Sequence, residues 1–159
     1  MGKIYILEGP DGTGKSTLAE ELQRETKGHL MHLTFNKYWD MQAYYMAAYN
    51  AAIELSNYQD VIIDRWIPSE IVYGSVFRKG PSFKTSNIPE FDNAKYIYCW
   101  NEKAVENHLK NKEVRKEMFD DMTDVVNTFE GYIAASNLPW VKYNFNHVEL
   151  SSFVKEITQ

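Results

Sequence analysis

Three glycines, a lysine and several hydroxyl side chains lie together in EGPDGTGKST, the stretch that spans residues 8–17. Gly9, Gly14, Lys15 and Ser16 match the pattern G-x-x-x-x-G-K-[ST] without a mismatch. Glycines let the backbone turn tightly, so that several N–H groups surround a phosphate. In this pattern the lysine reaches the β- and γ-phosphates, and the serine hydroxyl takes one Mg²⁺ coordination position. The stretch therefore predicts a site for a nucleoside triphosphate and Mg²⁺, against the alternative of a ligand-free turn.

The segments on both sides of this loop support a phosphate site. Residues 3–8 form a short apolar run that predicts a buried strand, and Leu18, Ala19 and Leu22 recur at helical spacing after the loop. That helix adds its positive N-terminal end to the phosphate site. With ATP as the donor, the loop residues expected to bind it are Gly9, Asp11, Gly12, Thr13, Gly14, Lys15, Ser16 and Thr17.

A second group of polar residues lies in VIIDRWIPSEIVYG, which spans residues 61–74. Asp64 ends a predicted strand, where a carboxylate can hold Mg²⁺ through water. Arg65 follows directly, and ligands bind at the carboxyl ends of parallel strands, so we expect both residues beside the loop. The candidate metal ligands are therefore Ser16 and Asp64. The alternative is a structural salt bridge between Asp64 and a nearby base.

Strands and helices alternate along the chain. The expected strands are residues 3–8, 29–35, 60–64, 94–100 and 140–145, and the expected helices are residues 16–27, 37–56, 69–79, 102–110, 115–135 and 150–157, with a loop at 79–90. This alternation predicts βαβ units and a parallel sheet covered on both faces. His29 and His32 would face opposite sides of their strand, so no zinc site is expected.

Length and composition exclude several classes of protein. A chain of 159 residues is long enough for one domain with its own core, and we expect residues 1–159 to form it. The formal net charge of −5 gives no general attraction to nucleic acid or to anionic membranes, although it does not exclude a local basic groove. No apolar run reaches the ~18 residues that cross a bilayer, no signal-peptide pattern is present, and Cys99 is the single cysteine. We expect a cytoplasmic protein, in the host cytoplasm if it is viral.

EGPDGTGKST together with DRWIPSEIVYG resembles the thymidylate kinase family of P-loop kinases. Members of that family carry a G-x-D-G-x-G-K-[ST] loop and a D-R-x-x-x-S-x-x-x-[YF] segment at this spacing. The resemblance is specific over these two motifs and elsewhere rests on the order of elements, and the short chain is similar to small kinases encoded by bacteriophages. It implies the three-layer α/β sandwich of P-loop NTPases, with five parallel strands in the order 2-3-1-4-5.

The resemblance also implies roles for residues on the acceptor side. The aspartate matching Asp11 contacts the 3′-hydroxyl of the acceptor sugar, and the arginine matching Arg65 clamps the acceptor phosphate, a task that suits guanidinium geometry. The tyrosine matching Tyr73 lies under the sugar and excludes a 2′-hydroxyl. Ser69 lies one helical turn before Tyr73 and is expected on the same face. Arg78 is a further candidate for an acceptor contact.

The chain departs from the family pattern after the second strand. Family members usually have an Arg-Glu-Pro stretch there, which touches the acceptor, whereas this chain reads TFNKYWD. Acceptor recognition must therefore differ, and Lys37, Tyr38 or Trp39 could provide it. Tyr45, on the same expected helix, could also line the acceptor pocket, although core packing explains most aromatic residues of that helix.

The family needs a catalytic arginine in the loop or in a mobile lid. The loop holds Gly12 and Thr13, so we expect the cation in a short lid at residues 111–119. Arg115 is the best candidate, with Lys116 beside it, and the alternative is a solvated basic turn.

These observations predict an ATP-dependent phosphotransferase in which Lys15, Asp64, Arg65 and Arg115 surround the transferred phosphoryl group. The expected acceptor is a pyrimidine deoxynucleoside monophosphate, either dTMP or a modified analogue. Alternatives are a free deoxynucleoside, a modified pyrimidine within DNA, and a nucleotide-binding switch without turnover. Thymidylate kinases are usually dimers, so the resemblance allows a homodimer, with the alternative that this short chain lacks the interface. No membrane partner is expected.

Overall fold

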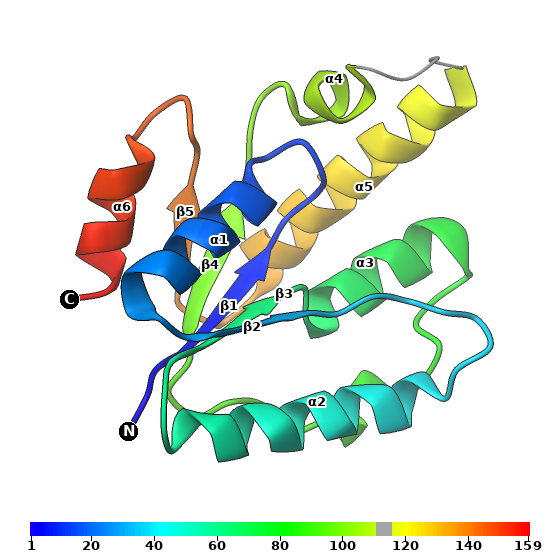
Figure 1. Cartoon of the computed structure of the whole chain (residues 1–159). Coiled ribbons are helices and arrows are strands. Elements are labelled where there is room, and N and C mark those ends of the chain that lie inside the picture. Colours follow the sequence, from blue (N-terminus) through cyan, green and yellow to red (C-terminus); the bar gives the residue numbers. More distant parts are fainter. Residues whose placement is uncertain (111–115) are drawn as a thin grey trace.

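The computed structural model describes residues 1–110 and 116–159, and in this part of the chain five parallel strands form one sheet. The order β2-β3-β1-β4-β5 confirms the predicted order (Figure 1). The register places Leu7 opposite Asp64, so the ends of the two central strands lie side by side. The strands are β1 (Ile4–Glu8), β2 (His29–His32), β3 (Val61–Asp64), β4 (Lys95–Cys99) and β5 (Trp140–Tyr143).

Helices cover both faces of the sheet, which confirms the predicted three-layer sandwich (Figure 1). Because side chains of a strand alternate between faces, Tyr5 and Leu7 of β1 pack with one set of helices, and Ile4 and Ile6 pack on the other face. The first face carries α1 (Lys15–Thr26) and α6 (Leu150–Ile157), and the second carries α2 (Met41–Ser56), α3 (Ile67–Phe77) and α5 (Lys116–Ala135). A short helix, α4 (Ala104–Leu109), follows β4. None of these helices is both long and apolar enough to cross a membrane.

Capping explains why two helices begin elsewhere than expected. α2 begins at Met41, not at residue 37, because the Asp40 carboxylate accepts a hydrogen bond of 3.0 Å from Ala43 N. α3 begins at Ile67, two residues earlier than expected, with Pro68 in its first turn. The backbone N–H of Trp66, at its N-cap, donates to the distant Glu8 carboxylate at 2.9 Å. Both shifts matter for the site. The start of α2 sets the path of the chain after β2, and the start of α3 sets the path of the chain after β3.

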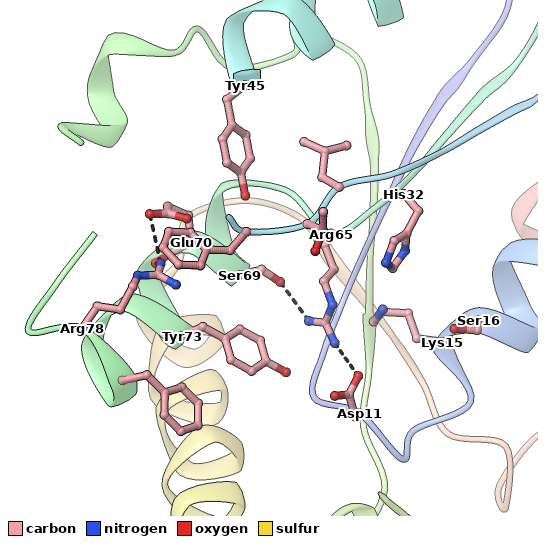
Figure 2. Close-up of a pocket in the computed structure, with 14 residues that line it drawn as sticks. Asp11, Lys15, Ser16, His32, Tyr45, Arg65, Ser69, Glu70, Tyr73 and Arg78 are labelled. Atoms are coloured by element: carbon pink, nitrogen blue, oxygen red, sulfur yellow. Dashed lines mark hydrogen bonds and ion pairs between the residues drawn. The ribbon is translucent and has the colours of Figure 1, made fainter. Parts of the chain in front are cut away.

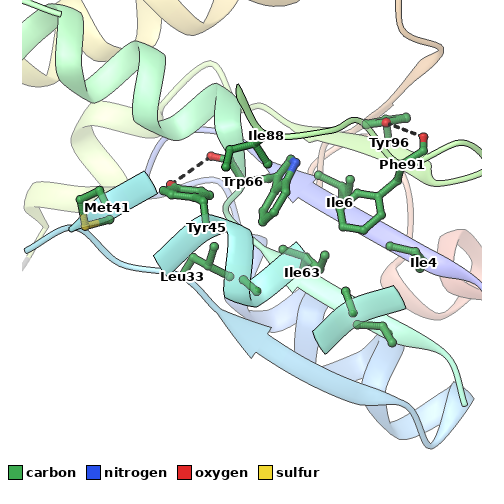
Figure 3. Close-up of a cluster of buried hydrophobic side chains, with 13 residues drawn as sticks. Ile4, Ile6, Leu33, Met41, Tyr45, Ile63, Trp66, Ile88, Phe91 and Tyr96 are labelled. Carbon is green, nitrogen blue, oxygen red and sulfur yellow. Dashed lines mark hydrogen bonds between the residues drawn. The ribbon is translucent and has the colours of Figure 1, made fainter. Parts of the chain in front are cut away.

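A cluster of aromatic side chains lies beneath the end of β3 (Figure 3). The buried Trp66 ring lies 5.3 Å from the ring of Tyr45 and 5.2 Å from that of Phe91, measured between centroids. Offset and edge-on contacts of this kind add stability beyond the area that they bury. Trp66 therefore anchors the chain directly after Arg65.

Candidate active site

The glycine-rich loop between β1 and α1 has the geometry of a phosphate-binding loop. Gly9 and Gly12 have φ angles of +141° and +83°, which favour glycine. A Cβ atom at Gly9 would lie 2.2 Å from the carbonyl oxygen of Cys99, and one at Gly12 would lie 2.2 Å from that of Ala104. No side chain caps the N-terminus of α1. The first turn of this helix therefore faces the loop with its N–H groups, as an anion site requires.

Lys15, His32 and Asp64 lie together where β2 and β3 end. Lys15 Nζ pairs with Asp64 Oδ1, and His32 Nδ1 lies 2.9 Å from Asp64 Oδ2. Burial acts to raise the pKa of Asp64, but Lys15 and His32 more than offset it, so that the pKa lies below its usual value. The expected alternative, a strand-end salt bridge, is thus present, and its partner is the loop lysine. Asp64 carries its charge within the site.

These residues fit a Mg²⁺ ion that arrives with a nucleotide. Within residues 1–110 and 116–159, no group of three or more His, Cys, Asp or Glu side chains could hold a metal by itself. Mg²⁺ usually keeps several waters and binds through one or two carboxylates together with substrate phosphates. The exposed Ser16 at the start of α1 and the ionised Asp64 supply oxygen ligands of this kind.

The Arg65 guanidinium points back toward the loop (Figure 2). Its Nη2 donates to Asp11 Oδ1 at 2.6 Å, and its Nη1 donates to Ser69 Oγ at 3.0 Å and to Gly9 O at 3.3 Å. Arg65 adopts a left-handed backbone conformation with φ of +75°, which is uncommon for a residue with a side chain. Its backbone N–H donates to Leu7 O at 3.0 Å, so the sheet ladder holds this conformation. The predicted position of Arg65 beside the loop is confirmed.

Glu8, the last residue of β1, is a functional candidate that the sequence interpretation missed. It is fully buried, and its carboxylate accepts hydrogen bonds from Trp66 N at 2.9 Å, Ser69 N at 2.8 Å and Ser69 Oγ at 2.6 Å. Burial raises the pKa of Glu8, against the opposing effects of Arg65 and of these hydrogen bonds. Ser69 Oγ in turn accepts from Arg65, so a chain of contacts runs from Glu8 through Ser69 to the guanidinium. A charged residue at the end of a buried strand, next to the loop, was the signal available in the sequence.

Tyr73 lies beside Arg65 on the face of α3 that lines the site. Its ring lies 5.0 Å from Arg65 Cζ and stacks against Phe77 with the planes 12° apart. Burial raises the pKa of Tyr73 to about 12, so its hydroxyl is neutral at physiological pH. The ring is therefore held as a flat, uncharged wall next to the guanidinium.

A cavity of about 540 Å³ brings Lys15 and Ser16 of the loop side together with predicted residues of the acceptor side. Figure 2 shows Lys15 and Ser16 on one side of it, Asp11, Arg65 and Tyr73 in the middle, and Glu70 and Arg78 on the opposite side. The predicted residues that line it are Asp11, Lys15, Ser16, Tyr45, Arg65, Ser69, Tyr73 and Arg78, and those that the prediction missed are His32, Leu33, Thr34, Phe35, Glu70 and Phe77.

Three residues that the sequence offered for an acceptor contact do not line this cavity. Tyr38 and Trp39 do not line the cavity, and the Trp39 ring packs 5.4 Å from that of Tyr44. The reason is the Asp40 cap, which starts α2 after Trp39 and leaves this aromatic pair on the surface. Lys37 lies over the Tyr38 ring at 5.1 Å and does not line the cavity either. The predicted lid cation, Arg115, lies outside the described residues.

A known protein resembles this chain in sequence over about half of its length. No protein-family model matches the chain. A provisionally named thymidylate kinase of Acidianus bottle-shaped virus (isolate Italy/Pozzuoli) is 35% identical over 83 residues, which cover 51% of this chain and 53% of that protein. The match therefore spans about half the length of this relative.

The fold as a whole is similar to two solved structures. The YorR protein of Bacillus subtilis, in complex with phosphorylated GDP, has a TM-score of 0.73 at 20% identity, over 98% of this chain and 94% of that one. Deoxyadenosine kinase of M. mycoides, with the products dCMP and a flexible dCDP, has a TM-score of 0.64 at 14% identity, over 98% and 96%. These likenesses confirm the fold, which is that of P-loop nucleotide kinases. The similarity to a thymidylate kinase comes from the sequence match.

Proposed function

We propose that this thymidylate-kinase-like P-loop protein transfers the γ-phosphate of ATP to a deoxynucleoside monophosphate, with dTMP or a modified pyrimidine analogue as the acceptor. One observation carries the proposal: Lys15 and Ser16 line the same cavity as Arg65, Asp11 and Tyr73. A donor site and an acceptor site that share one cavity can hold two phosphates in line for transfer.

The loop side of the cavity would bind the donor. Its backbone N–H groups surround the β-phosphate, and Lys15 leaves its pair with Asp64 to contact the β- and γ-phosphates. Ser16 and Asp64 would hold Mg²⁺, which when bound neutralises negative charge on the phosphates. The protein's own contribution is to position the two substrates and to supply cations at fixed places.

The middle of the cavity would bind the acceptor. The Arg65 guanidinium suits a bidentate contact with a phosphate, and Ser69 and Gly9 O already fix its plane. Asp11, now paired with Arg65, accepts a hydrogen bond from the 3′-hydroxyl of the sugar. The Tyr73 ring packs under the sugar, where a 2′-hydroxyl would collide with it.

Arg115 is proposed as the further cation that contacts the transferred phosphoryl group, with Lys116 as the alternative. Arg115 lies outside the described residues, so a variant tests this assignment. Arg115→Ala should lower kcat by about 10²-fold or more, because removing a single transition-state charge contact has effects of that size. A kcat that does not change would remove Arg115 from the mechanism while leaving the loop and Arg65 in place.

ADP release tests the proposal across a panel of acceptors. Purified protein with ATP and Mg²⁺ is assayed with thymidine, dTMP, other deoxynucleoside monophosphates and an oligonucleotide that contains a modified pyrimidine. We expect stimulation by monophosphates above all. Product formed on the oligonucleotide alone would favour a kinase acting on DNA, and binding of ATP without stimulation by any acceptor would favour a nucleotide-binding switch.

A free deoxynucleoside is the second candidate acceptor. A free deoxynucleoside has no phosphate, so it needs fewer cations in the cavity than a monophosphate. Among the described residues that line the cavity, Arg65 is the one arginine beside the phosphate loop, because Arg78 lies on the opposite side. The similarity of this fold to that of a deoxyadenosine kinase also supports a free deoxynucleoside as the acceptor. In the panel, this function predicts a greater kcat/KM for thymidine than for dTMP.

A further inference from the structure

His32, the last residue of β2, is part of the cavity wall and has no role in the function proposed above. It lines the cavity on the same side as Lys15 and Ser16 (Figure 2). Its side chain is 57% exposed, whereas that of Asp64 is 5% exposed. The described residues that line the cavity include Lys15 and His32 but not Asp64. The Asp64 carboxylate therefore meets the cavity through these two partners.

The contact between His32 and Asp64 is set by the sheet. The two residues are register partners on the neighbouring parallel strands β2 and β3, so their side chains project from the same face. A backbone hydrogen bond of 3.1 Å from Leu33 N to Asp64 O holds the two strand ends together. His32 Nδ1 thus reaches Asp64 Oδ2, at 2.9 Å, from a fixed backbone position.

The second partner of Asp64 is held less firmly. Lys15 reaches Asp64 Oδ1 from helix α1, on a side chain with a flexible four-carbon stem. Lys15 can therefore turn to the phosphates of a nucleotide while the backbone stays in place. When it does so, Oδ1 loses its partner, and His32 stays on Oδ2.

The direction of the hydrogen bond from His32 follows from the charge of Asp64. The pKa of Asp64 lies below its usual value despite burial, so the carboxylate is ionised and can only accept hydrogen bonds. The proton of the contact is therefore on His32 Nδ1, which donates to Oδ2. A carboxylate that is held by one oxygen in this way keeps its plane and leaves its other oxygen for a ligand.

We propose that His32 is a positioning residue of the metal site. It fixes Asp64 through Oδ2, so that Oδ1 is available to the Mg²⁺ that arrives with the nucleotide once Lys15 has left. Hydrogen bonds to a carboxylate that binds a metal orient it and raise the affinity of the site. The proposal rests on the donor side of the function proposed above and does not depend on the acceptor.

Binding of AMP-PNP, an ATP analogue that is not hydrolysed, tests the proposal in the absence of any acceptor. Calorimetry gives its Kd once with Mg²⁺ and once with EDTA, and the ratio of the two values reports how much the metal adds to binding. His32→Leu should lower this ratio by about tenfold, the effect of losing a contact that orients a metal ligand. The His32 side chain is largely in solvent, so the variant should fold, which thermal unfolding checks.

Two further variants separate positioning from a general effect of the substitution. His32→Asn places an amide donor near the position of Nδ1 and should keep the ratio within about threefold of the wild type. His29→Leu changes an exposed histidine at the start of the same strand and should leave the ratio unchanged.

A double-variant cycle with Asp64→Asn shows whether His32 acts through Asp64. Adding His32→Leu to Asp64→Asn should lower the ratio by less than about twofold, since two residues that act as a unit are not additive. A ratio that is unchanged or raised in His32→Leu, or a full further loss in the double variant, would overturn the proposal. Absence of transfer to any monophosphate, with the ratio lowered as expected, would contradict the proposed function and leave the role of His32 in place.

Discussion

The Arg65 guanidinium donates a hydrogen bond of 2.6 Å to the Asp11 carboxylate, and this ion pair joins the phosphate loop to the segment after β3. The two side chains come from residues 54 positions apart, and each is proposed to bind a different part of the acceptor. Burial disfavours the charge of Arg65, but Tyr73, Asp11, Glu8 and Asp64 outweigh it and raise the pKa of the guanidinium. Arg65 therefore stays cationic and ready for a phosphate.

Glu8→Gln is expected to weaken acceptor binding. Glu8 does not contact the acceptor itself, and its effect is transmitted by Ser69 to Arg65. The amide replaces a carboxylate oxygen that accepts from Ser69 Oγ, so Ser69 becomes a poorer partner for Arg65. Loss of about 1–2 kcal/mol predicts a KM for dTMP that rises roughly tenfold, with kcat and the KM for ATP nearly unchanged. Steady-state kinetics measure this split. A matched control is Glu20→Gln, on the exposed face of α1. Equal rises in both KM values would point to general damage.

Gly12→Ala is expected to destabilise the protein and to distort the loop. Its Cβ would lie 2.2 Å from Ala104 O at a φ of +83°, so backbone must move. We expect a loss of about 2–4 kcal/mol in the free energy of unfolding, measured by urea denaturation, together with weaker ATP binding.

Gly131→Ala provides the matched control for that substitution. Gly131 lies in α5, and a Cβ there would meet no atom within 4 Å. Alanine should therefore raise the free energy of unfolding by about 0.5–1 kcal/mol, because it favours the helix. If the two variants lose stability equally, the close approach at Gly12 does not limit the loop.

Tyr73→Ala is expected to relax the choice between deoxyribose and ribose. Removing the ring frees the space in which a 2′-hydroxyl would collide, so the ratio of kcat/KM for dUMP over UMP should fall about tenfold. Tyr73→Phe keeps the ring between Phe77 and Phe129 and should leave the ratio unchanged. A ratio that stays constant in Tyr73→Ala would remove Tyr73 from sugar recognition.

Asp64→Asn is expected to raise the Mg²⁺ concentration at half-maximal velocity by about tenfold, since a neutral amide is a poorer partner for a metal-bound water. Initial rates against free Mg²⁺ measure the change. Asp60→Asn, before β3 and with a carboxylate that accepts from Lys3 N, is the control. An unchanged Mg²⁺ requirement in Asp64→Asn would limit Asp64 to its contacts with Lys15 and His32.

The sequence predicted those site residues whose positions follow from the residues next to them in the chain. Lys15 and Ser16 follow from the loop motif, and Asp64 and Arg65 follow from the end of an apolar strand, because parallel strands end at one edge of the sheet. The covered faces follow from the alternation of strands and helices, and the strand order was implied by the resemblance to the thymidylate kinase family. The expected homodimer and the lid stay predictions.

Residues whose roles depend on distant partners could not be predicted in this way. Glu8 binds Ser69, 61 positions away, and His32 binds Asp64, 32 positions away. Glu70 binds Ser82, which lies in a loop with no regular pattern. Trp39 was expected at the acceptor, but one capping residue, Asp40, starts α2 after it, and Trp39 does not line the cavity. Such contacts become visible with the tertiary structure.

Transfer of label from [γ-³²P]ATP to dTMP, compared between the wild type and Arg65→Ala, tests most directly whether two phosphates meet in this cavity. The wild type should form labelled dTDP, and the variant should lose about 10²–10³-fold in kcat/KM for dTMP while it still binds ATP, because a bidentate phosphate contact is removed. A variant that forms dTDP at the wild-type rate, or a wild type that labels no nucleotide, would contradict the account.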